Sequence, residues 1–118
     1  MKSIYIAGPM SGYPEFNFPA FFAAEEKLSA EGWKVWNPAD KDAEYDLDPE
    51  ACKTGDNKLV IEKGFDFRAA CLWDCEKVIN SDAIYMLSGW QYSLGASGEH
   101  AVAVTIKKHY PEYQIIYG

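Results

Sequence analysis

Four short runs of β-branched and aromatic residues alternate with longer segments in which apolar residues recur at helical spacing. The runs, each predicted to form a strand, are 3–7, 33–36, 83–87 and 114–117. Helices are predicted between them, over 18–31, 68–80 and 98–108. Asn17 is positioned to cap the first helix and Gly32 to end it. This alternation predicts an open, mostly parallel sheet covered by helices on both faces.

The second predicted helix has an apolar stripe with a carboxylate beside it. The stripe, which we expect to face the core, consists of Cys71, Leu72, Cys75, Val78 and Ile79. Asp74 lies at the rim of this stripe, where partial burial would raise the pKa of its carboxyl group, as a general acid requires. A solvated carboxylate on the helix surface is the alternative.

The segment 40–66 interrupts the regular pattern. It holds nine acidic and four basic residues, with Pro49 and Gly55 as helix breakers. We expect a long, solvated and partly mobile loop, and a lid over a substrate is the alternative.

Composition indicates one compact domain spanning residues 1–118, because 48% of the residues are hydrophobic. The net charge of −7 disfavours nucleic-acid polymers and anionic membranes, so small molecules are the expected partners. No apolar run reaches the roughly 18 residues of a membrane span, and the first strand is too short for a signal peptide, so we expect a cytoplasmic protein.

The three cysteines are Cys52, Cys71 and Cys75, and none forms a CxxC pair. We expect Cys71 and Cys75 to be reduced thiols in the core, and we expect no metal and no cofactor.

Ligands of parallel sheets bind beyond the carboxyl ends of the strands. That rule selects two loops, residues 8–13 after the first strand and residues 37–40 after the second. The candidate residues in the first loop are Gly8, Pro9, Ser11 and Gly12, and the candidate in the second is Asn37. It also selects 88–99, where Trp90 can stack on a base or cover the core. In that stretch the residues suited to a phosphate or sugar hydroxyl are Ser93, Gly95, Ser97 and Gly98. Glu99 is expected in the first turn of the third helix, where the dipole would lower its pKa.

Five segments together resemble the nucleoside 2-deoxyribosyltransferase superfamily and its relatives, the deoxynucleoside 5′-monophosphate N-glycosidases. They are IYIAGPMSG, NFPAF, WNPAD, SDAIYMLSGW and SLGASGEHAVA, in this order. The resemblance implies a flavodoxin-like fold and cleavage of N-glycosidic bonds through a glutamate nucleophile. It also implies a homo-oligomer in which a neighbouring subunit completes each site.

Carried over by position, the resemblance makes Glu99 the nucleophile and Tyr5 the residue that orients it. Asp74 would be the partner acid or a carboxylate that orients the substrate. Ser93 would contact the sugar or phosphate, and Gly8 and Gly95 would allow close backbone approach. The monophosphate glycosidases carry a serine and an arginine in the first loop, where this chain has Pro9 and Ser11. A strong contact to a 5′-phosphate is therefore missing there.

The leading hypothesis is cleavage or transfer at the N-glycosidic bond of a 2′-deoxynucleoside or its 5′-monophosphate. The alternative from another class is a nucleotide-binding module without catalysis. A phosphoribohydrolase of the lysine-decarboxylase-like type is a third reading, but its PGGxGT signature is absent.

Overall fold

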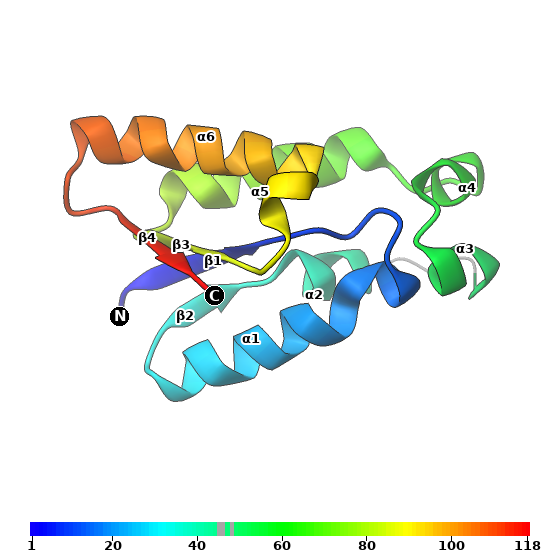
Figure 1. Ribbon diagram of the computed structural model, residues 1–118, viewed down its shortest axis with the longest axis horizontal. Helices are drawn as coiled ribbons and strands as arrows, with labels where there is room; N and C mark the ends of the chain where they lie inside the picture. Colours follow the sequence, from blue (N-terminus) through cyan, green and yellow to red (C-terminus); the bar gives the residue numbers. More distant parts are fainter. Residues whose placement is uncertain (45–46, 48) are drawn as a thin grey trace.

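A computed structural model describes residues 1–44, 47 and 49–118 of the chain. In this part of the chain four strands form a single sheet with the order β2-β1-β3-β4, and every neighbouring pair is parallel (Figure 1). The strands are β1 (Ser3–Ala7), β2 (Lys34–Trp36), β3 (Ala83–Met86) and β4 (Gln114–Tyr117). The order is that of a flavodoxin-like α/β fold, which confirms the predicted fold class.

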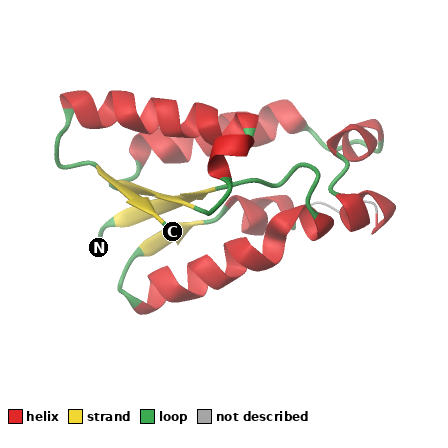
Figure 2. Cartoon of the chain, viewed as in Figure 1, coloured by secondary structure: helices red, strands yellow, loops and turns green. Residues whose placement is uncertain are grey.

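Helices cover both faces of the sheet, as Figure 2 shows. The longest are α1 (Phe18–Ala30) on one face, and α5 (Phe67–Asn80) and α6 (Leu94–His109) on the other. Ile4 and Ile6 pack against α1, whereas Tyr5 faces α5 and α6 together with Ala7. The alternation of side chains along β1 therefore directs the Tyr5 hydroxyl to the α6 side of the sheet.

For the described residues of 40–66, the prediction of a loop is wrong, whereas most of them are exposed to solvent as expected. They form three short helices, α2 (Pro38–Asp42), α3 (Pro49–Thr54) and α4 (Asn57–Glu62). Ala51 of α3 and Val60 of α4 are buried in a small core with Phe16, and this burial offsets the cost of ordering the segment. The remaining part of this prediction concerns Tyr45, Asp46 and Asp48, which lie outside the described residues.

A backbone contact joins the α3–α4 segment to the loop after β1. The Gly12 amide donates to the Gly55 carbonyl oxygen at 2.8 Å. Gly55 has φ +70°, and a Cβ atom there would lie 2.3 Å from the Tyr13 carbonyl oxygen. Only glycine allows both this conformation and this approach.

The predicted buried face of α5 is wrong. Of the five stripe residues only Val78 is buried, whereas Leu72 is 70% exposed, Ile79 is 56% exposed and both Cys71 and Cys75 are exposed. Apolar residues occur on more than one side of this helix, so spacing does not determine which side packs. All three cysteines are free, but Cys71 and Cys75 are not core thiols.

The start of α1 also differs from the prediction. Asn17 adopts a left-handed conformation with φ +61° and makes no capping hydrogen bond. Its side-chain amide instead donates to the Pro9 carbonyl oxygen at 2.9 Å, which holds the loop after β1 against α1. Glu15 and Phe16 share the left-handed conformation and form a 3-10 turn, η1 (Pro14–Asn17), which leaves Phe16 buried.

None of the helices in the described ranges is long and apolar enough to cross a membrane.

Candidate active site

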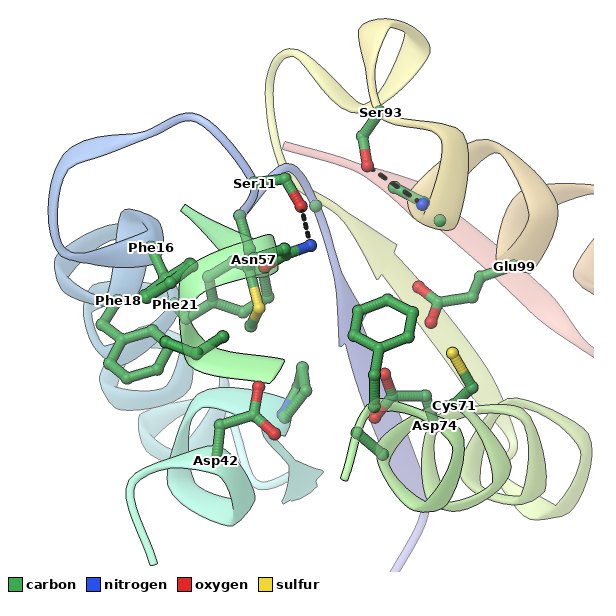
Figure 3. A pocket seen from close by; sticks show the side chains of 18 of the residues that line it. Ser11, Phe16, Phe18, Phe21, Asp42, Asn57, Cys71, Asp74, Ser93 and Glu99 are labelled. Atoms are coloured by element: carbon green, nitrogen blue, oxygen red, sulfur yellow. Dashed lines mark hydrogen bonds between the residues drawn. The ribbon is translucent and has the colours of Figure 1, made fainter. Parts of the chain in front are cut away.

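A cavity lies at the carboxyl ends of β1 and β3, between the loop after β1 and helices from both layers (Figure 3). The carboxyl ends of parallel strands meet at one edge, which is why residues far apart in sequence converge there. Seven of the residues predicted for the site line this cavity: Tyr5, Gly8, Ser11, Asp74, Ser93, Gly95 and Glu99.

Glu99 and Tyr5 form the central contact of the cavity. The Tyr5 hydroxyl donates to Glu99 Oε2 at 3.0 Å, so the contact expected between these residues is confirmed. Tyr5 is only 1% exposed, which fixes its ring beneath the carboxylate. Burial raises the pKa of Glu99 to about 7, and the hydrogen bond from Tyr5 acts in the opposite direction.

The expected lowering of the Glu99 pKa by the helix dipole is therefore wrong. Helix α6 begins at Leu94 rather than near Gly98, and Ser93 caps it by accepting from the Ala96 amide at 3.2 Å. Glu99 consequently lies in the second turn, where the dipole is weak and burial is the larger effect.

Asp74 projects from α5 into the same cavity (Figure 3). Burial is the main cause that raises its pKa to about 8, with further contributions from the charges of Glu99 and Asp42. The Tyr5 hydroxyl again acts in the opposite direction. Near pH 7, Asp74 thus retains its proton while Glu99 is partly ionised. One cavity therefore holds a protonated carboxyl group together with a partly ionised one.

Asp42, at the end of α2, is a third carboxyl group in the cavity that sequence reasoning missed. Burial raises its pKa to about 6, and the charge of Lys41 opposes the shift. In the sequence, the feature that could have indicated Asp42 is its position soon after Asn37 and Pro38, because these residues follow the carboxyl end of β2.

Asn37 does not line the cavity. It is buried, its side-chain oxygen accepts from the Ala39 amide at 2.8 Å, and its amide group reaches the Phe21 carbonyl oxygen. Its role is to cap α2, the helix that carries Asp42.

The other predicted residues outside the cavity lining are Pro9, Trp90, Ser97 and Gly98. Trp90, in the 3-10 turn η2 (Trp90–Tyr92), stacks on His100 with ring centroids 4.1 Å apart. The Ser97 hydroxyl donates to the Trp90 carbonyl oxygen at 3.2 Å, and Gly98 lies on the exposed side of α6. Trp90, Ser97 and Gly98 therefore lie at the α6 end of the sheet, and Pro9 lies in the loop after β1, where its carbonyl oxygen accepts from Asn17.

Apolar side chains line much of the rest of the cavity, and sequence reasoning missed this apolar wall as well. The residues that form it include Met10, Phe16, Phe18, Phe21, Val60, Phe65 and Phe67. A hydrogen bond from Asn57 to the Ser11 hydroxyl joins α4 to the loop after β1 at the cavity edge. A flat ring fits between aromatic side chains of this kind. The compact NFPAF segment was the signal that could have indicated the wall.

Charge in the cavity comes from carboxyl groups. Among the lining residues that the structure describes there is no Lys, Arg or His. Within the same described part of the chain, no group of three or more His, Cys, Asp or Glu side chains is arranged to hold a metal ion. The arrangement supports acid, base and nucleophilic chemistry on a ligand rich in hydrogen-bond donors.

Comparison of the sequence with curated proteins and with solved structures finds no match. The family DUF4406, described as a domain of unknown function, matches residues 2–110. This range includes all three carboxyl groups of the cavity and Tyr5. The chain belongs to the DUF4406 family.

Proposed function

We propose that the protein cleaves the N-glycosidic bond of a 2′-deoxynucleoside or its 5′-monophosphate with retention, using water or a second base as the acceptor. The observation that carries this proposal is the Glu99 carboxyl group, hydrogen-bonded to Tyr5 in a cavity that also holds Asp74. The resemblance of five sequence segments to the nucleoside 2-deoxyribosyltransferase superfamily supports the same chemistry.

In the first step a carboxylate oxygen of Glu99 attacks C1′ and the C1′–N bond breaks. The electron pair of that bond passes to the base nitrogen, and Asp74 donates a proton to the departing base. A pKa of about 8 keeps Asp74 protonated near neutral pH, which suits this role. The product is a deoxyribosyl ester of Glu99.

In the second step a water molecule, or a nitrogen of a second base, attacks C1′ of the ester. Asp74, now ionised, accepts the proton of the incoming nucleophile, and the C1′–O bond to Glu99 breaks. Glu99 and Asp74 return to their starting states. The apolar wall of the cavity offers a stacking surface for the base in both steps.

The experiment is incubation with the common 2′-deoxynucleosides and their 5′-monophosphates, with and without a free acceptor base, followed by chromatography of released base. Glu99→Gln is expected to reduce turnover by more than about a thousandfold, because an amide is a poor nucleophile. Glu26→Gln, on the exposed side of α1, is the matched control and should retain turnover. Turnover at the native rate in Glu99→Gln would rule out the proposed nucleophile.

The same experiment separates the enzyme from a non-catalytic nucleotide-binding module. A binding module would retain a deoxynucleoside in equilibrium dialysis and release no base. An enzyme releases base, and under slow turnover it carries a deoxyribosyl adduct that mass spectrometry detects on the peptide containing Glu99.

A further inference from the structure

We propose that Asp42 determines base specificity, its carboxylate accepting a hydrogen bond from an exocyclic amino group of the base. The favoured substrates are then deoxynucleosides of amino-bearing bases, such as deoxyadenosine and deoxycytidine, over the matched keto compounds deoxyinosine and deoxyuridine. This inference rests on the proposed function, because it uses the orientation that attack by Glu99 imposes.

The positions of the carboxyl groups define the two ends of the cavity. C1′ must lie against Glu99, so the sugar occupies the α6 end, beside Ser93 and Gly95. Figure 3 shows Asp42 and Asp74 pointing toward one another from opposite walls, Asp42 from α2 and Asp74 from α5. A base bonded to C1′ and protonated by Asp74 therefore extends toward Asp42.

Within the described part of the chain, the carboxyl group of Asp42 has no side-chain or backbone donor, so it can accept a hydrogen bond from a ligand. Lys41, the adjacent cation, forms an ion pair with Glu44 at 3.1 Å. The apolar wall contributes aromatic rings and no donor side chain. The oxygen atoms of Asp42 are not among the fully buried side-chain atoms that lack a partner, so a ligand in the cavity can reach them. An amino group of that ligand would donate to a carboxylate that is already partly removed from water.

The chemistry of the bases then gives the direction of selectivity. Adenine and cytosine carry an amino group where hypoxanthine and uracil carry a carbonyl oxygen. An amino group of the base can donate a hydrogen bond to the Asp42 carboxylate. A carbonyl oxygen at the same position carries a partial negative charge, so it repels the carboxylate and gives it no hydrogen bond. Hydrogen bonds to charged groups correspond to a preference of about 10- to 100-fold in kcat/KM.

The test compares kcat/KM within each matched pair, deoxyadenosine against deoxyinosine and deoxycytidine against deoxyuridine. The native protein should prefer the amino compound by at least about 10-fold in one or both pairs. Asp42→Asn, which has the same shape and presents both a donor and an acceptor, should reduce that ratio to near one. Glu44→Gln, an exposed neighbour in the same segment, should keep the native ratio. Asp42→Ala provides a second variant, and thermal melting verifies that each variant is folded.

Failure of this inference and failure of the proposed function give different results. Cleavage of keto and amino compounds at equal kcat/KM, or an unchanged preference in Asp42→Asn, overturns the role of Asp42 and leaves the proposed function standing. If no base is released, dissociation constants of the same four compounds, measured by equilibrium dialysis, test Asp42 without catalysis. An amino preference in binding that Asp42→Asn removes supports the inference even when the proposed turnover fails. Absence of binding by all four compounds overturns both.

Discussion

Burial separates the pKa values of three carboxyl groups that share one cavity. The pKa is raised to about 6 at Asp42, to about 7 at Glu99 and to about 8 at Asp74, with burial as the largest cause at each. Asp74 also feels the charges of the other two, which is why its pKa is highest. The three groups therefore differ in protonation near neutral pH, although their ordinary pKa values lie close together.

We expect the pH profile of kcat/KM to be a narrow bell. Glu99 must be ionised to attack, so the rate rises as the pH increases through about 7. Asp74 must be protonated to assist the base, so the rate falls as the pH increases through about 8. Initial rates between pH 5 and pH 10 measure both limbs. A profile that is flat from pH 6 to pH 9 would contradict these roles.

Replacing Tyr5 by phenylalanine should move both limbs of that bell to higher pH. The Tyr5 hydroxyl lowers the pKa of Glu99 and of Asp74, so its removal lets both values rise. At pH 7 a smaller fraction of Glu99 is then ionised, and kcat/KM should fall about 10-fold. Tyr85→Phe is the matched control, because the hydroxyl of this buried tyrosine lies near Lys27 on the α1 side of the sheet. An unshifted acid limb in Tyr5→Phe would show that the hydroxyl does not tune Glu99.

Among the secondary-structure elements, the short helix α4 contributes to the cavity wall, and α3 packs beside it through Ala51. Val60 of α4 lines the cavity, and the hydrogen bond from Gly12 to Gly55 fastens the two helices to the loop after β1. The close approach at Gly55 leaves no room for a side chain. The position of this wall therefore depends on one glycine.

We expect Gly55→Ala to destabilise the protein by more than about 2 kcal/mol, through both a positive φ and a clash with Tyr13. Gly12→Ala is the matched control, since Gly12 has φ +80° but no atom within 4 Å of its added Cβ, and it should cost about 1 kcal/mol. Urea unfolding of both variants gives the difference. Equal losses would show that the tight contact does not hold the segment.

At the scale of the whole molecule, several apolar side chains of α5 and α6 are exposed. Leu72 and Ile79 of α5 are largely exposed, whereas Cys71 of the same helix lines the cavity. Leu94, at the start of α6, is also almost fully exposed. Exposed apolar groups on adjacent helices are typical of a surface that another subunit covers.

We therefore expect a homo-oligomer at micromolar concentration, detected by sedimentation velocity near neutral pH. Leu72→Glu should shift the protein toward the monomer, because it puts a charge where an exposed leucine would pack against a partner subunit. Ile61→Glu, on exposed α4, is the control and should leave the sedimentation coefficient unchanged. A native monomer with full activity would exclude both the oligomer and a site shared between subunits.

The sequence by itself determined the sheet, and its resemblance to a known family indicated the contact between Tyr5 and Glu99. Strand periodicity is local, so the bounds of β1 and β4 agree with the prediction and those of β2 and β3 differ by one residue. Alternation separates Tyr5 from Ile4 and Ile6, but only the fold shows that Tyr5 lies on the α6 side of the sheet. The rule that ligands lie beyond the carboxyl ends of parallel strands then selected the loop after β1 and the start of α6.

Only the tertiary structure decided which side of each helix is buried, and with it the electrostatics of the site. Apolar residues surround α5, so packing against the sheet exposed Leu72 and turned Asp74 toward the cavity. Burial is the sum of contacts from distant elements, which is why the direction of the Glu99 pKa shift could not be read from its position on a helix. Asp42 joined the site for the same reason, because α2 meets α5 only in the folded chain.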